Sequence, residues 1–240
     1  MGRLAQAPQG SVASGYDELD AQLPGGVWPA RALTELLLPR AGVGELRLLA
    51  PALAAVQAQG RDLLWLDPPA EPCAWALAEL GVNVKQMVLV RSRQVLKTKA
   101  PPRPAAGAVN PAADVLWALE HALKSGHLGA ALAWLPAHPG VRLPADALRR
   151  LQLAAQAHDG PVFLFRSDAE RTRPSPAPLR LLLNCAGPDL LQVHLLKRRG
   201  PPLQQPLWLD LPPVLSDAAL ERAWQLQGDS ASSEATSVEA

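Results

Sequence analysis

The chain has 240 residues, and 48% of them are hydrophobic, which fits one large domain or one domain with an appendage and argues against wholesale disorder. The 23 lysines and arginines nearly balance the 22 acidic residues, for a net charge of +1. Charge alone therefore argues against a strongly electropositive nucleic-acid binder, although it allows a local basic patch.

The cysteines and the apolar runs argue against several further classes of protein. Cys73 and Cys185 lie far apart and in no C-x-x-C pair, unlike the cysteines of a disulfide framework or a structural zinc site. The first ten residues lack the apolar region of a signal peptide, and no apolar run approaches the roughly 18 residues that cross a membrane. We therefore expect a soluble, cytoplasmic protein that does not contact a membrane.

The chain opens with a predicted helix and a predicted strand. Residues 14–26 (SGYDELDAQLPGG) are typical of a short helix, in which Ser14 and Asp17 form a capping box and Pro-Gly-Gly ends the helix. Residues 32–38 (ALTELLL) predict a buried strand that ends at Pro39.

The next predicted helix contains a proline. Within residues 42–60, Leu46, Leu49 and Leu53 recur at the spacing of one helical face. Pro51 falls inside this stretch and disfavours the helical region for the residue before it. We therefore expect a kink there, or two short helices.

Strand-like and helix-like segments then alternate as far as residue 166. Such alternation predicts an α/β fold with a mostly parallel, twisted sheet flanked by helices. Residues 92–113, rich in proline and alanine, predict an exposed loop. The expected strands are 62–67, 87–91, 131–135 and 162–166, and the expected helices are about 72–80, 112–124 and 145–158.

The end of the chain departs from this alternation. Residues 179–184 and 190–196 are apolar and are joined by the turn-like CAGPD, which predicts an antiparallel hairpin. A short candidate helix runs from Ser216 to Gln227. We divide the chain into a flexible N-terminus (1–12), a main domain (13–211), a C-terminal helix (212–227) and a polar, disordered tail (228–240).

Residues 39–46 (PRAGVGEL) occupy the strand–loop–helix setting of a phosphate loop. In the motif G-x-x-x-x-G-K-[ST], backbone N–H groups and the lysine bind phosphates, and the hydroxyl holds Mg²⁺. Here Pro39 replaces the first glycine, Glu45 replaces the lysine and Leu46 replaces the hydroxyl. The motif is therefore degenerate at three of its defining positions.

The two glycines of this loop do not compensate for the lost lysine. Gly44 matches the motif, and Gly42 beside it indicates a tight turn. About 4 Å from a phosphate, replacing a cation by an anion changes the interaction energy by roughly 8 kcal/mol at an effective dielectric of 20. We therefore expect no nucleotide cofactor.

Residues 14–38 (SGYDELDAQLPGGVWPARALTELLL) resemble the opening of RecA, in which a helix with a Leu-Asp pair and a Gly-Gly turn precede the phosphate-loop strand. With residues 39–53 (PRAGVGELRLLAPAL) and 196–202 (LKRRGPP), the run resembles the ImuA family of SulA/RecA-like proteins associated with translesion DNA synthesis. The resemblance covers most of residues 12–210 and weakens in 92–113. It implies a RecA-like three-layer fold.

The resemblance also implies that two further catalytic elements are missing. The catalytic glutamate of RecA ends the run I-D-A-E after the second strand, and the matching residues here are Leu66-Asp67-Pro68-Pro69. Pro69 thus stands in place of the glutamate, and Glu71 comes two positions late. Where the Walker B strand of RecA ends in an aspartate that assists Mg²⁺, ALAWLPAH offers Trp134, Leu135 and Pro136. Together with the degenerate loop, these losses imply a protein without enzymatic activity.

A basic cluster and two basic loops are the candidate contact sites. Lys197 and Arg199, which flank Arg198, match a Lys-x-Lys that reaches the ATP of the neighbouring subunit in RecA filaments. The alternative interpretation is a solvated strand end.

Three further arginines, Arg142, Arg171 and Arg173, lie in loops that match the DNA-binding loops of RecA. The second of these loops contains acids and prolines and has no aromatic residue on which a base could stack. We therefore expect at most a weak DNA contact.

The tryptophans separate into expected core and candidate anchors. Trp65, Trp117 and Trp134 lie on predicted elements and are expected in the core. Leu220 and Trp224 share a face of the candidate C-terminal helix, which would either bind a partner or fold back on the sheet. The five histidines have no metal-binding spacing.

The resemblance implies a non-catalytic accessory role in SOS-induced, error-prone translesion synthesis. The implied partners are an ImuB-type polymerase-like hub, RecA and, indirectly, an error-prone DNA polymerase alpha subunit. A SulA-like inhibitor of cell division that binds FtsZ is the alternative, since SulA also lacks a phosphate loop. An active recombinase would need the missing lysine.

Overall fold

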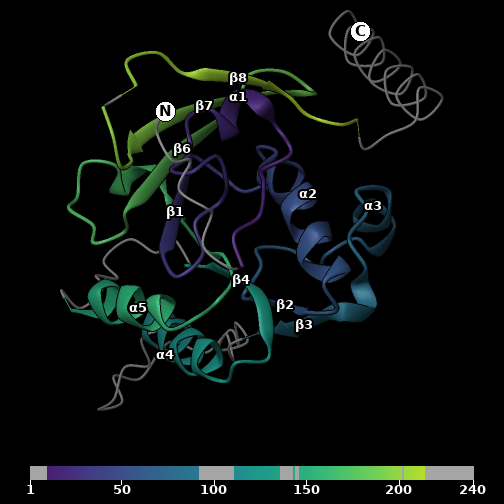
Figure 1. The fold of residues 1–240 in the computed structure, drawn as a ribbon, viewed down its shortest axis with the longest axis vertical. Coiled ribbons are helices and arrows are strands. Elements are labelled where there is room, and N and C mark those ends of the chain that lie inside the picture. Colours follow the sequence, from purple (N-terminus) through teal and green to yellow (C-terminus); the bar gives the residue numbers. More distant parts are fainter. Residues whose placement is uncertain (1–9, 92–110, 136–142, 144–145, 202, 214–240) are drawn as a thin grey trace, which may run out of the picture.

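The computed structural model describes residues 10–91, 111–135, 143, 146–201 and 203–213. Strands and helices alternate along most of this length, as the sequence predicts (Figure 1). In chain order the elements are α1 (Asp17–Asp20), β1 (Leu33–Leu38), α2 (Glu45–Ala58), β2 (Asp62–Leu66), α3 (Ala74–Glu79), η1 (Val84–Gln86), β3 (Met87–Val90), α4 (Pro111–Lys124), β4 (Leu128–Trp134), α5 (Ala147–Gln156), β5 (Val162–Ser167), η2 (Asp168–Glu170), β6 (Leu179–Cys185), β7 (Leu190–Lys197) and β8 (Leu207–Asp210).

The described strands form one eight-stranded sheet in the order β3-β2-β4-β5-β1-β6-β7-β8. The strands from β3 to β6 in this order are parallel, and β7 pairs antiparallel with both β6 and β8. The predicted α/β fold, mostly parallel sheet and antiparallel hairpin are therefore confirmed. β1 lies between β5 and β6, so the loop after it opens near the middle of the sheet.

Helices cover both faces of the sheet. α2 packs Leu48 and Leu53 against one face, while α4 and α5 lie together against the other (Figure 1). Side chains of successive strand residues point to opposite faces, so in β1 Leu36 belongs to the α2 core and Leu33 to the α4–α5 core. Apolar residues at consecutive positions thus supply both cores.

The first predicted helix is shorter than expected, and its capping box is wrong. α1 has four residues, with Tyr16 as its N-cap and no side-chain cap. The Ser14 hydroxyl instead accepts a hydrogen bond from the Tyr16 N–H at 3.1 Å. The Ser14 N–H donates to the Asp20 carboxylate at 2.8 Å, which closes the segment as a compact turn.

α2 runs without interruption across Pro51, so the expected division into two short helices is wrong. Pro51 has no N–H for the carbonyl of Arg47 four residues earlier, and the Tyr16 hydroxyl donates to that carbonyl at 3.0 Å. Gly15 lies against the proline ring, because a Cβ there would be 2.6 Å from the Pro51 Cβ. Residues 14–16 thus compensate for the proline from outside the helix.

Other differences concern the ends of elements and one tryptophan. β4 begins at Leu128 rather than at 131, and β8 was not predicted. Trp65 and Trp134 are buried as expected, whereas Trp117 on α4 is 62% exposed, so its assignment to the core is wrong.

The domain boundaries proposed from the sequence stay predictions. The last described strand, β8, ends at Asp210. The predicted loop 92–113 lies outside the described residues up to 110, and its last residues belong to α4. The predicted C-terminal helix from Ser216 also lies outside them.

Candidate functional site

The loop between β1 and α2 has the setting predicted for a phosphate loop. It follows a strand near the middle of the sheet, and ligands of α/β sheets bind beyond the carboxyl ends of the strands. Gly42 and Gly44 have φ angles of 79° and 111°, which residues with a Cβ adopt only with strain. Pro39, at the start of the loop, is exposed.

The carboxylate of Glu45, the first residue of α2, binds this loop. It accepts hydrogen bonds from the N–H of Gly42 at 2.8 Å and from the N–H of Gly44 at 3.1 Å, and Glu45 is 4% exposed. Backbone N–H groups at a helix start are the donors that bind phosphates in ATPases. An incoming phosphate would therefore have to displace the chain's own carboxylate.

Pro69 occupies the position that the resemblance matches to the catalytic glutamate, so this position supplies no acid. Asp67, directly after β2, has a positive φ of 48°, and Pro68 lies between the two. Glu71 is engaged in an ion pair with Arg91 at 2.6 Å. The two prolines separate this acid from the end of β2.

Aromatic rings lie where the resemblance to RecA would place the Walker B aspartate. Trp134 at the end of β4 is buried. Its ring lies 5.4 Å from that of Trp65 on β2 and stacks on Phe165 of β5, with 4.4 Å between the ring centroids. The ends of these three strands thus present an apolar surface, where an ATPase has an acid.

A pocket of about 470 Å³ lies beside the loop, within the size range of small-molecule sites. It is lined by the start of α2, the segment after β2, and α3, with Leu46, Trp65 and Leu77 among its apolar side chains. Among the described residues that line it, Arg47 is the one basic residue, and it pairs with Asp189 at 2.5 Å. The described lining therefore offers no uncommitted cation for a phosphate.

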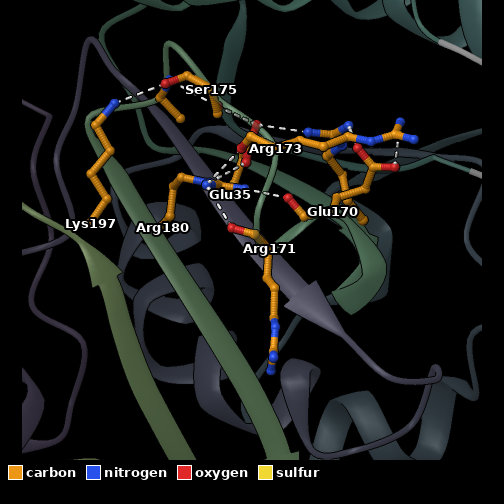
Figure 2. Close-up of polar contacts among 9 residues, drawn as sticks. Glu35, Glu170, Arg171, Arg173, Ser175, Arg180 and Lys197 are labelled. Carbon is orange, nitrogen blue, oxygen red and sulfur yellow. Dashed lines mark hydrogen bonds and ion pairs between the residues drawn. The ribbon is translucent and has the colours of Figure 1, made fainter.

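A second polar cluster lies under residues 168–178, which connect β5 to β6. Its centre is Glu35 of β1, which has no exposed surface. The Glu35 carboxylate accepts hydrogen bonds from Ser175 Oγ at 2.6 Å, from Arg166 Nη1 at 3.3 Å and from Arg180 Nε at 2.8 Å (Figure 2). The arginines on β5 and β6 thus neutralise a carboxylate that would otherwise be unstable in the interior.

This cluster fixes the conformation of residues 168–178. The guanidinium of Arg180 donates to the carbonyls of Glu170, Arg171 and Arg173 at 3.0, 3.4 and 3.2 Å. Parallel strands are usually connected through an α-helix, whereas this connection contains only the 3-10 turn η2. Hydrogen bonds to Arg180 supply the attachment that a packed helix would otherwise give.

Two of the predicted basic sites lie close together. Lys197 donates from Nζ to the Ser175 carbonyl at 2.8 Å and so contacts the loop that carries the predicted DNA-contact residues. In that loop Arg173 pairs with Glu170 at 3.0 Å, while the exposed side chain of Arg171 extends away from the Glu35 cluster (Figure 2). No aromatic side chain accompanies these arginines within 168–178.

The three residues of the Lys197–Arg199 cluster have different surroundings. Arg198 binds its own chain, because its Nη1 donates to the carbonyl and the side-chain oxygen of Gln22 at 2.9 and 2.7 Å. Arg199 is exposed and makes no hydrogen bond or ion pair within the described residues. Arg199 is therefore the member of the cluster most accessible to a partner.

Three candidate residues, Arg142, Leu220 and Trp224, lie outside the described residues. The structure thus leaves their predicted DNA and partner contacts as predictions.

The buried cluster around Glu35 was not found by sequence reasoning. Its signal was present, because Glu35, Arg166 and Arg180 each interrupt or end an apolar run that was predicted as a buried strand. A charge at such a position needs a partner of opposite sign. Sequence alone does not show that β5, β1 and β6 are neighbours, so the pairs could not be assigned.

Comparisons with known proteins give no further identification. No protein-family model matches the chain, and a search of curated proteins finds no significant relative. Within the described residues, no helix is long and apolar enough to cross a membrane, and no group of three or more histidine, cysteine or acidic side chains could hold a metal ion.

Proposed function

We propose that this protein is a RecA-like member of the ImuA family. In this proposal it is a non-catalytic accessory protein of SOS-induced, error-prone translesion DNA synthesis. It acts by binding other proteins, namely an ImuB-type hub and RecA, and through the hub an error-prone polymerase alpha subunit.

The observation that carries the proposal is the bonding of Glu45 within the β1–α2 loop. Its carboxylate holds the N–H groups of Gly42 and Gly44, which are the groups that a phosphate would need. The aromatic rings of Trp65 and Trp134 line the adjoining pocket. A domain that keeps this loop but cannot bind a phosphate there is best suited to binding other proteins.

The order of the strands supports the RecA-like assignment over two other α/β folds. In the Rossmann and flavodoxin-like orders the first and second strands are adjacent. Here β4 and β5 lie between β1 and β2. The β1–α2 loop therefore follows a strand whose neighbours in the sheet are β5 and β6.

The basic strand end supplies the proposed contact with RecA. Arg199 is exposed, and Lys197 lies two residues before it. Cations beside the γ-phosphate of a terminal RecA subunit would stabilise the contact through charge-assisted hydrogen bonds. Such a contact would weaken as salt rises.

Binding assays with purified ImuB, RecA and FtsZ test the proposal. We expect binding to ImuB and to RecA loaded with ATP, and weaker binding to RecA loaded with ADP. The Lys197→Ala/Arg199→Ala variant should bind ATP-loaded RecA at least tenfold more weakly. Its melting temperature should stay within a few degrees of wild type, because both side chains are exposed.

Arg149→Ala is the matched control, since Arg149 is an exposed arginine on α5. Equal affinity for the ATP and ADP states, or a double variant that binds as the control does, would remove the RecA contact from the proposal. Binding to FtsZ without ImuB or RecA would favour the SulA-like alternative.

A further inference from the structure

We propose that the apolar pocket beside the β1–α2 loop is covered by the C-terminal segment of the same chain, residues 214–240, through Leu220 and Trp224. The inference concerns the isolated protein and does not depend on its partners.

The described chain ends at the pocket. Leu211 is 4% exposed and packs on the loop, because a Cβ on Gly44 would lie 2.6 Å from Leu211 Cδ1. The next carbonyl, that of Pro212, accepts a hydrogen bond from Arg47 Nη1 at 3.3 Å. Gly44 and Arg47 both line the pocket, so the chain beyond Pro213 starts at its rim.

The pocket itself is suited to apolar side chains. Its lining combines Trp65, Trp134, Leu46 and Leu77 with several prolines and alanines. The charged residues of its wall, among them Glu45 and Arg47, are already bonded within the chain. An occupant would therefore be held by burial of apolar area rather than by charge.

The C-terminal segment supplies such side chains within reach. Leu220 and Trp224 are four residues apart, the spacing of one helical face. Trp224 is eleven residues beyond Pro213, which corresponds to about 16 Å of helix or about 36 Å of extended chain. The tail beyond residue 227 is polar and offers little to bury.

Two free cysteines allow a direct test. Both are exposed in the described residues, but Cys73 lines the pocket and Cys185 lies at the end of β6. The rate of alkylation by iodoacetamide is measured for each cysteine by mass spectrometry, in the full chain. The variants are Leu220→Ser/Trp224→Ser and, as a matched control in the tail, Val238→Ser.

We expect the double variant to react at Cys73 at least fivefold faster than wild type, with the rate at Cys185 unchanged. Val238→Ser should behave as wild type. A synthetic peptide of residues 214–227, added in excess to the double variant, should slow the alkylation of Cys73 again.

Equal rates at Cys73 in wild type and double variant would overturn the proposal. Protection of Cys73 that increases with protein concentration would also overturn it, because the covering segment would then come from a second copy. Failure of the peptide to protect the double variant would show that the substitutions act on Cys73 other than by uncovering the pocket.

Discussion

Glu45 both removes the charge that a nucleotide needs and takes up the donors that a phosphate would bind. In the sequence, Glu45 is an anion in place of the motif's lysine. The structure adds two hydrogen bonds, to the N–H groups of Gly42 and Gly44. At the start of α2 the carboxylate is also favoured by the helix dipole. Glu45 therefore stabilises the same loop that it closes to phosphate.

The first prediction is that the dissociation constant for Mg·ATP is not below about 100 μM. Glu45→Lys should not produce hydrolysis, because Pro69 and Trp134 stand at the positions that the resemblance to RecA assigns to the catalytic acid and the metal-assisting aspartate, and neither has a carboxylate. Isothermal titration and a phosphate-release assay measure the two outcomes. Mg·ATP-dependent turnover by the variant would contradict this account.

The second prediction concerns the stability contributed by Glu45. Glu45→Ala leaves the two loop N–H groups without their acceptor and should lower the free energy of unfolding by about 1–3 kcal/mol. Urea denaturation measures the change. Glu79→Ala on α3, an exposed acid, is the control and should change it by less than about 0.5 kcal/mol. Equal effects would mean that the hydrogen bonds of Glu45 contribute nothing.

The third prediction compares a buried and an exposed ion pair. Glu35→Ala leaves the buried Arg180 without a carboxylate and Arg166 with Glu170 as its only acidic partner within the described residues, and should destabilise the protein by about 3–5 kcal/mol. Asp159→Ala breaks the pair with Arg31, whose side chains are 58% and 62% exposed, and should change stability by less than about 1 kcal/mol. Urea denaturation of both variants measures the two losses of stability, and equal losses would show that burial does not set the contribution of an ion pair.

At the scale of elements, α2 depends on a residue outside it. The Tyr16 hydroxyl donates to the Arg47 carbonyl, which Pro51 cannot reach with an N–H. Burial raises the pKa of Tyr16 above its usual value, while the nearby charge of Arg47 lowers it. The hydroxyl therefore retains its proton at neutral pH and remains a donor.

The fourth prediction is a coupling between these two residues. Tyr16→Phe should cost about 1–2 kcal/mol, because the Arg47 carbonyl loses its donor. In a Pro51→Ala background the alanine N–H can bond that carbonyl, so the same change should cost less. A double-mutant cycle measured by urea denaturation gives the coupling. Strict additivity would show that the Tyr16 hydroxyl does not substitute for the missing helix N–H.

Elements with a strong local pattern could be predicted, and those that depend on distant contacts could not. The runs that form β1, β2, β5, β6 and β7 are apolar enough to identify from sequence. β8 has four residues with one buried side chain, Leu209, and so has little pattern of its own. The continuity of α2 depends on Tyr16, 31 residues away from Arg47, and helix propensity does not contain that information.

The candidate site shows the same limit. Its position, the β1–α2 loop, followed from the order of strand, glycines and helix. The bonding of Glu45 to the loop depends on backbone angles at Gly42 and Gly44 that the motif does not specify. The contact of Lys197 with Ser175 requires the predicted pairing of β6 with β7 and also the path of residues 168–178, which has no local pattern.

At the scale of the whole molecule, one histidine links folding to pH. His158 lies between α5 and β5 and is 2% exposed. Desolvation by burial, with a smaller effect of the Arg61 charge and an opposing one of Asp159, lowers its pKa to about 4 from a usual 6.5. The folded protein thus holds His158 neutral, while the unfolded chain protonates it below about pH 6.5.

The fifth prediction follows from this difference. Between about pH 6.5 and pH 4 the unfolded state binds more protons than the folded state. The stability gained by keeping His158 neutral is therefore complete above pH 6.5 and is lost as the pH falls through this window. The loss should reach about 2–3 kcal/mol. His158→Gln should flatten that part of the pH profile of unfolding. The exposed His127, changed to Gln as a control, should leave the profile unchanged, and identical profiles for both variants would contradict the assignment.

The aromatic rings at the ends of β2, β4 and β5 have an optical consequence. The indoles of Trp65 and Trp134 lie 5.4 Å apart at a tilt of 48°. Two like chromophores this close share their electronic transitions, and a tilt that is neither parallel nor perpendicular makes the coupled pair chiral. The pair should therefore give the protein a strong intrinsic circular dichroism band. Because both rings line the pocket, anything that enters it and turns either ring should change that band without any attached label.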